Sequence, residues 1–224
     1  MNSVENTGFS IASLEFGADM PVTPTENFVK GVYGSVDEAT ACGLDRLRSE
    51  EGIIPSCKLS CWHCCRFHIL INIAEAHTLA QYIRRELPAD QIEGLRMRTQ
   101  QWHEWDNSRP GRHPPAVIVE HTDFSGYQHC CPLLVNGACR AYPVRPMVCR
   151  THFVLSNPLS CRSANDPEST EGAPVVLSSV LKATSAFSKK IRVHIENEGL
   201  DFSRSQMLLP HWLAIEMGWE FAIE

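Results

Sequence analysis

The stretch Cys57-Lys-Leu-Ser-Cys61-Trp-His-Cys64-Cys65 places four cysteines within nine residues. Thiolates are soft ligands that select zinc, Cu(I) or iron–sulfur clusters. Gaps of two to four residues between ligands are typical of chelating motifs. Four thiols at this spacing are difficult to explain as ordinary core residues. The stretch therefore predicts a protein that is organised around a cysteine-ligated metal site.

A second group of cysteines lies further along the chain. Its members are Cys130, Cys131, Cys139, Cys149 and Cys161. The dipeptide Asn136-Gly137 between apolar residues is a strong signal for a tight hairpin turn. Such a hairpin would bring Cys131 and Cys139 together. Pro146 favours an extended residue before it and a short helix or turn just ahead of Cys149.

The order of these elements resembles the YkgJ-type cysteine-cluster family, whose members are described as zinc- or iron-chelating domains. The family pattern begins with a cluster that ends in a vicinal cysteine pair, matched by Cys57–Cys65. A helix of the type x-x-Glu-Ala-x-x-Leu-Ala follows, matched by Glu75–Ala80. The pattern then runs through Cys-Pro-x-Leu, Gly-x-Cys-x-x-Tyr and Arg-Pro-x-x-Cys-Arg, matched between Cys131 and Arg150. The resemblance covers roughly residues 55–165, and the extra Cys130 is a departure from the pattern. The resemblance implies that the chain binds zinc or iron.

We expect the metal ligands to be Cys57, Cys61, Cys64, Cys65, Cys131, Cys139, Cys149 and Cys161. Two adjacent cysteines cannot comfortably bind one tetrahedral ion, because the backbone directs their side chains apart. We therefore expect the two groups to share one joint site. The expected cofactor is zinc or iron, including a 4Fe-4S cluster, since tetrahedral sulfur coordination suits both. Cys42, on a predicted helix, is expected to be a small apolar side chain.

Several polar residues near the cysteines are candidates for supporting roles. The histidines are His63, His68, His129 and His152. Each is interpreted as a ligand, a proton donor or an ordinary hydrogen-bonded surface residue. Arg145 and Arg150 flank Cys149 and carry fixed positive charge. We expect them to donate hydrogen bonds to the negatively charged thiolates.

Three functions are compatible with these features. The first is a metal-binding protein whose thiolate cluster is structural or handles metal. The second is an iron- or cluster-dependent enzyme that modifies a protein or peptide, as implied by a larger relative of the family, the flagellin lysine methylase. The third is a radical S-adenosylmethionine enzyme, because Cys57-x-x-x-Cys61-x-x-Cys64 has that spacing; no strand clearly precedes the cluster, however, and His63 replaces the usual aromatic residue. The sequence leaves open whether the protein is an enzyme.

Composition narrows the class of partner. The chain has 224 residues, a hydrophobic fraction of 43% and a formal net charge of −6. The negative charge argues against a nucleic-acid partner, which would need a basic face, and the arginines Arg84, Arg85, Arg96 and Arg98 are interpreted as a solvated helix face. We see no targeting segment and no apolar run long enough to span a membrane. The expected location is therefore cytoplasmic, where thiols stay reduced. The expected partners are metal ions and a protein or peptide, with no nucleic acid and no membrane.

The expected fold class is mainly α with a small irregular β-hairpin, in which the helices pack around a cysteine-rich metal-binding core. Residues 1–34 are expected to form an irregular N-terminal arm, and residues 35–224 a single domain. Within this domain, residues 55–165 are the metal-binding region and residues 175–224 a helical C-terminal extension. Helices are expected over residues 35–50, 73–87, 89–105, 175–198 and 210–217, a short strand over 116–119, and a surface loop carrying Cys161 over 157–174.

Overall fold

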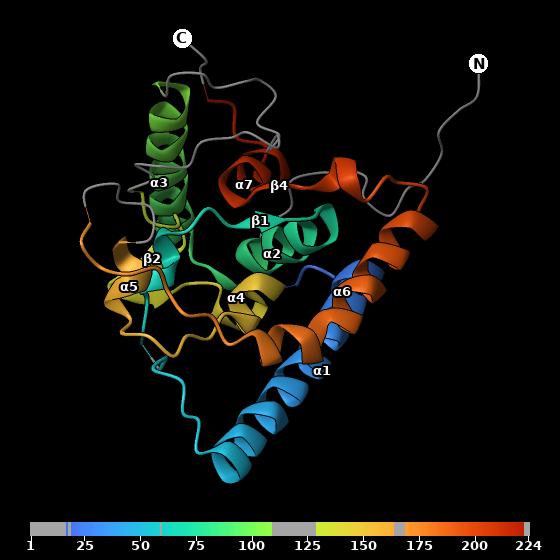
Figure 1. The fold of residues 1–224 in the computed structure, drawn as a ribbon. Helices are drawn as coiled ribbons and strands as arrows, with labels where there is room; N and C mark the ends of the chain where they lie inside the picture. The colour runs from blue at the N-terminus through green and yellow to red at the C-terminus, as the bar shows by residue number, and fades with distance from the viewer. Residues whose placement is uncertain (1–16, 18, 59, 109–128, 164–168, 222–224) are drawn as a thin grey trace.

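The computed structural model describes residues 17, 19–58, 60–108, 129–163 and 169–221. They form a mainly helical fold with two small antiparallel sheets (Figure 1). The longer helices are α1 (Pro24–Arg46, extended by a π-helical turn at Leu47–Glu51), α2 (Ile73–Glu86), α3 (Ala89–Ser108), α6 (Ser178–Asn197) and α7 (Leu209–Met217); the short ones are α4 (Met147–Thr151) and α5 (Leu159–Ser163). One sheet pairs β1 (Leu70–Ile71) with β4 (Met207–Leu208), and the other pairs β2 (Leu134–Val135) with β3 (Ala138–Cys139). The strand expected over residues 116–119 lies outside the described residues.

Helix α1 begins at Pro24, not at Ser35 as the sequence suggested. The hydroxyl of Thr23 accepts a hydrogen bond from the backbone N–H of Glu26 at 3.1 Å, which is half of a capping box. Pro24 occupies the first turn, where its missing N–H costs nothing. Residues 24–34 are therefore helical, and the expectation of an irregular arm was wrong for them. The helix and its π-helical turn end at Gly52, whose φ of 66° is left-handed, as expected.

The other long helices follow the sequence closely. The Asn72 side chain caps α2 by accepting from the N–H of Glu75 at 3.0 Å, and α7 ends at Gly218 with a φ of 64°. One expectation was wrong: Cys161 lies in α5 and is buried, where the sequence suggested a surface loop. None of the described helices is both long enough and apolar enough to cross a membrane.

The main hydrophobic core lies between α2, α3 and α7. It is built from aliphatic and aromatic side chains such as Leu79, Ile83, Leu95, Trp212 and Leu213. Cys131 is buried in this core, and Cys65, Cys139 and Cys149 are partly buried against it. The helices thus pack around an apolar core that includes Cys131 and borders three other cysteines. That this region binds metal stays a prediction.

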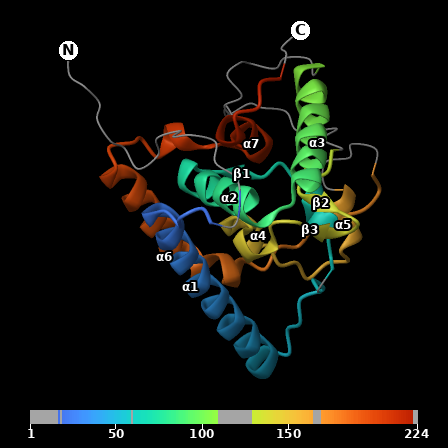
Figure 2. The same ribbon diagram turned by 180° about the vertical axis from the view of Figure 1, so that it is seen from behind.

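The arrangement of the helices defines where the cysteines lie. Figures 1 and 2 show α5 and the β2–β3 hairpin beside the lower end of α3, whereas the α1–α6 pair borders the opposite side of the molecule. Helix α4 lies between these two regions in both views. Helix α7 is tied to the chain just before α2, because Trp212 Nε1 donates to the carbonyl of Ile71 at 3.2 Å.

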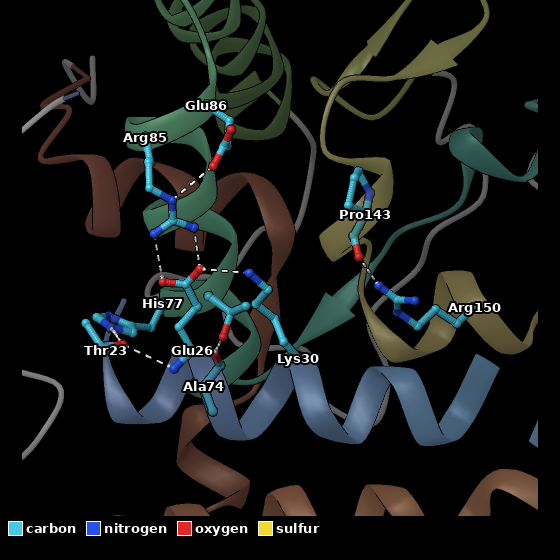
Figure 3. Close-up of polar contacts among 10 residues, drawn as sticks. Thr23, Glu26, Lys30, Ala74, His77, Arg85, Glu86, Pro143 and Arg150 are labelled. Carbon is cyan, nitrogen blue, oxygen red and sulfur yellow. Dashed lines mark hydrogen bonds and ion pairs between the residues drawn. The ribbon is translucent and has the colours of Figure 1, made fainter. Parts of the chain in front are cut away.

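A buried ion pair joins α1 to α2. The carboxylate of Glu26, on α1, is fully buried and accepts from both terminal nitrogens of Arg85, on α2, at 3.1 and 2.5 Å. Lys30 approaches the same carboxylate at 3.5 Å. Figure 3 shows Glu26 held between these two cations. This contact fixes the position of α1 against the helix that follows the first cysteine group.

Candidate functional site

A cavity of about 320 Å³ lies between the first cysteine segment, the β2–β3 hairpin and the start of α4. Seven of the eight predicted ligands line it: Cys57, Cys61, Cys64, Cys65, Cys131, Cys139 and Cys149. The eighth, Cys161, lies beside the wall, with its sulfur 3.8 Å from Nε2 of the wall residue His152. The fold therefore brings the two cysteine groups of the sequence together around one space.

Hydrogen bonds hold the two groups side by side. The N–H of Cys131 donates to the carbonyl of Cys65 at 2.7 Å. At the other end of the first group, the N–H of Val154 donates to the sulfur of Cys57 at 3.3 Å, and the N–H of Ser56 donates to the carbonyl of Val154 at 2.8 Å. Because most of these bonds use the main chain, the arrangement does not depend on any single thiol.

The β2–β3 hairpin forms where Asn136-Gly137 predicted it. Asn136 and Gly137 have φ values of 52° and 75°, as the two central residues of a type I′ turn require. The hairpin pairs Leu134 with Cys139. Trp62, from the first cysteine segment, packs on the turn so closely that a Cβ atom on Gly137 would lie 3.4 Å from Trp62 Cδ1.

We expect Gly137→Ala to destabilise the protein by about 1–2 kcal/mol, because an L-residue is strained in the left-handed region. Gly43→Ala is the matched control. Gly43 lies inside α1 with open space around it, so alanine there should stabilise by about 0.5–1 kcal/mol. Urea denaturation of both variants measures the two effects. Equal effects at the two positions would contradict the turn geometry.

Cys64 and Cys65 differ in their electrostatic character. The thiol of Cys65 donates to the sulfur of Cys64, which lowers the pKa of Cys64 to about 7. The same hydrogen bond, together with burial, raises the pKa of Cys65 far above its usual value. Of the vicinal pair, Cys64 is therefore the residue that carries thiolate character near neutral pH.

The surroundings of three thiols of the second group, Cys131, Cys149 and Cys161, favour their protonated form. Burial raises the pKa of Cys131 and that of Cys161 to about 12, and neighbouring thiols add to both shifts. Burial also raises the pKa of Cys149 well above its usual value. The charge of Cys64 contributes to the shift in all three cases. Cys64, a member of the first group, thus lies within electrostatic reach of three cysteines of the second group.

We expect the stability of the chelator-treated protein to fall as the pH rises from about 8.5 towards 12. A thiol has a pKa of about 8.5 when unfolded, whereas Cys131 has one of about 12 in the fold. Between these two pKa values the folded state binds more protons than the unfolded state. The contribution of such a thiol to stability is therefore fully present below about pH 8.5 and is lost as the pH rises towards 12. Each such thiol contributes a slope of at most about 1.4 kcal/mol per pH unit. Urea denaturation between pH 7 and 11 measures this slope, and a flat profile would contradict it.

The thiols line the wall of the cavity and do not converge on one point. Within the part of the chain that the structure describes, no three His, Cys, Asp or Glu side chains are arranged to hold a metal ion as they stand. A tetrahedral zinc site needs its sulfurs about 2.3 Å from one centre. A single-ion site therefore requires several of these thiols to move inward.

The four histidines near the cysteines have different surroundings. His152 lines the cavity, whereas His129 packs against Trp105 of α3 with ring centroids 4.7 Å apart. His63 tilts against Trp62 at 5.1 Å. Burial lowers the pKa of three of them, His68, His129 and His152. His152 is thus the one of these four that is placed to act in the cavity, as a neutral imidazole near pH 7.

The two arginines support the backbone around Cys149. Each of the three guanidinium nitrogens of Arg150 donates to an oxygen: the carbonyls of Arg145 and Pro143 and the carboxylate of Asp37. Figure 3 shows the contact with Pro143. The expectation that Arg150 donates to sulfur was therefore wrong. Arg145 donates to the carbonyl of Tyr142 at 3.1 Å, and its charge helps to lower the pKa of Cys139, although burial raises that pKa overall.

Residues other than the cysteines complete the cavity wall. The larger apolar and aromatic ones are Trp62, Ile69, Leu133, Leu134, Tyr142, Phe153 and Leu209. Those next to the cysteines in sequence were foreseeable from their position. Leu209 was not, because it reaches the wall only through the packing of α7.

The described fold and cavity define a mainly helical protein with a thiol-lined cavity. No protein-family model, no curated protein and no solved structure matches this chain. Membership of the YkgJ-type family stays a prediction that rests on the motifs of residues 55–165.

Proposed function

We propose that this chain is a metal-binding protein whose cysteine thiolates hold zinc or iron in one site formed jointly by the two cysteine groups. One observation carries the proposal: seven of the eight predicted ligands line a single cavity, and the eighth lies beside its wall. Clustered soft donors of this kind select zinc, Cu(I) or iron–sulfur centres. Such a site would bind metal with release of protons from the thiols.

The shape of the cavity favours an iron–sulfur cluster over closed zinc sites. A zinc ion occupies little space and draws four sulfurs to about 2.3 Å from one point. In an iron–sulfur cluster the cysteines bind different iron atoms around a core of bridging sulfides, so their sulfurs stay further apart. Thiols spread over the wall of a cavity of about 320 Å³ suit the second arrangement better.

Anaerobic purification with metal analysis, sulfide assay and absorption spectroscopy tests the proposal. We expect a brown protein that contains iron and acid-labile sulfide. A colourless protein with about two zinc ions per chain would replace the cluster with closed zinc sites. A protein that binds neither metal in stoichiometric amounts, after reconstitution under reducing conditions, would refute the proposed function.

An iron- or cluster-dependent enzyme that acts on a protein or peptide is the second candidate. It is favoured by the cavity wall, where His152 and a largely apolar surface accompany the thiols. A closed structural site requires neither an acid–base group nor a binding surface beside the metal. A catalytic metal needs an open coordination position and nearby acid–base groups. A spectral shift of the reconstituted protein on addition of cyanide would support an open coordination position. An unchanged spectrum would favour the closed site.

A further inference from the structure

A buried carboxylate on α2 connects three helices next to the thiol-lined cavity. Oε1 of Glu75 accepts from the hydroxyl of Tyr33 on α1 at 3.0 Å and from the N–H of Met147, the first residue of α4, at 2.7 Å. Oε2 accepts from the side-chain amide of Asn72 at 2.7 Å. Glu75 is only 5% exposed. Three donors therefore satisfy a charge that would otherwise be costly to bury.

Helix α4 depends on contacts from outside itself for its position. It has five residues and no side-chain cap at its start, and a helix this short is not stable alone. It carries Cys149 and Arg150. The guanidinium of Arg150 lies 4.1 Å from the centre of the Tyr33 ring, so Tyr33 contacts α4 through its ring and Glu75 through its hydroxyl. Helices α1 and α2 thus hold α4 through Tyr33 and Glu75.

We propose that Glu75 is a positioning residue that sets how the thiol of Cys149 is presented to the cavity. The inference rests on the proposed metal-binding function. Glu75 acts through Met147, because the bond to the Met147 N–H fixes the start of the turn on which Cys149 lies. This role explains why a carboxylate is buried on α2 at a point where an apolar residue would otherwise suit the core.

The hydrogen bonds around Glu75 allow a test by exchange of donor and acceptor. In Glu75→Gln, the N–H₂ of the new amide faces another donor in either orientation, namely the side-chain amide of Asn72 or the N–H of Met147. Asn72 cannot turn its amide to compensate, because its oxygen accepts from the N–H of residue 75. In Asn72→Asp, two carboxylates face each other. The double variant Asn72→Asp/Glu75→Gln restores every hydrogen bond and keeps the total charge. Only the bond between side chains 72 and 75 is reversed, because residue 75 now donates and residue 72 accepts. It therefore separates the geometry of the network from the location of its charge.

The measurement is titration of the full-length, chelator-treated protein with Co²⁺, followed through the thiolate-to-cobalt charge-transfer band. We expect Glu75→Gln to weaken Co²⁺ binding by about 10- to 100-fold, as loss of an outer-shell contact does in other metal sites. We expect the band to change in intensity as well, because Cys149 is displaced. The double variant should recover most of the affinity and the parent spectrum. Tyr33→Phe, which removes one donor, provides a milder second variant if Glu75→Gln does not fold.

Glu26→Gln is the matched control for a merely structural role. Glu26 is an equally buried carboxylate between α1 and α2, but its partners are Arg85 and Lys30. The Glu26→Gln substitution should lower the stability of the protein and leave the Co²⁺ spectrum unchanged. Equal losses of affinity in Glu26→Gln and Glu75→Gln would overturn the proposal, as would parent-like binding in Glu75→Gln.

Alkylation of Cys149 by iodoacetamide separates failure of this inference from failure of the proposed function. Cys149 is partly buried, so a displaced α4 should raise its alkylation rate in the chelator-treated Glu75→Gln variant and not in Glu26→Gln. If the parent bound no Co²⁺, the metal-binding function would fail while the alkylation rates still decided the positioning role. Equal rates in the parent and Glu75→Gln would then overturn it.

Discussion

Replacing Cys64 with serine should release metal from the whole site and not from one cysteine group. Cys64 lines the shared cavity, and its charge acts on Cys131 and Cys149 as well as on Cys161. If the proposed joint site exists, loss of one of its ligands should weaken retention by more than about 100-fold, the upper range for loss of an outer-shell contact. Metal analysis after dialysis against a chromophoric chelator measures this effect.

Cys42→Ser is the matched control for this prediction. Cys42 is an exposed thiol on α1 and does not line the cavity, so its replacement should leave metal content unchanged. Retention of one metal at parent affinity by Cys139 and Cys149 in the Cys64→Ser variant would contradict the joint site. Two separate cysteine knuckles would then replace it.

We expect Arg85→Met to reduce the free energy of unfolding by about 3–5 kcal/mol, the cost of leaving a buried charge without its partner. The side chain of Glu26 is fully buried and that of Arg85 is 9% exposed. Lys30 is 45% exposed and 3.5 Å from the carboxylate, so it should compensate only in part. The loss should loosen the contact of α1 with α2. Urea denaturation of the full-length protein measures the change.

Arg192→Met provides the comparison. Arg192 pairs with Glu196 on the exposed face of α6, and such surface pairs contribute about 0–1 kcal/mol. Adding Glu26→Gln to Arg85→Met should recover part of the loss, because it removes the uncompensated charge. An Arg85→Met cost as small as that of Arg192→Met would show that the buried pair does not hold α1 in place.

Local sequence signals predicted most of the helices because each depends on residues close in the chain. Asn72 and Pro88 bracket α2, and Asn136-Gly137 specifies the hairpin turn. The start of α1 had an equally local signal in Thr23-Pro-Thr-Glu26. Ser35-Val-Asp-Glu38 offers a second capping pattern, which favoured a start at Ser35 but lies inside the helix. Ser35 there donates back to the carbonyl of Gly31 at 3.2 Å.

The sequence alone determined which thiols gather around the cavity. The spacing of Cys57–Cys65 and the order of the later cysteines identified the thiols that surround the cavity. These features are visible because ligand spacing is a short-range property of a loop or hairpin.

Only the tertiary structure decided how those thiols are supported. The supporting contacts join segments that are distant in the chain. They are the hydrogen bond from Cys131 to Cys65, the part of the cavity wall formed by Leu209, and the hydrogen bond from Met147 to Glu75. Such contacts depend on how the apolar faces of α2, α3 and α7 pack, and many pairings of those faces satisfy the same hydrophobic pattern. The packed core selects one of them, and with it the carboxylate and the carbonyls that surround each cysteine.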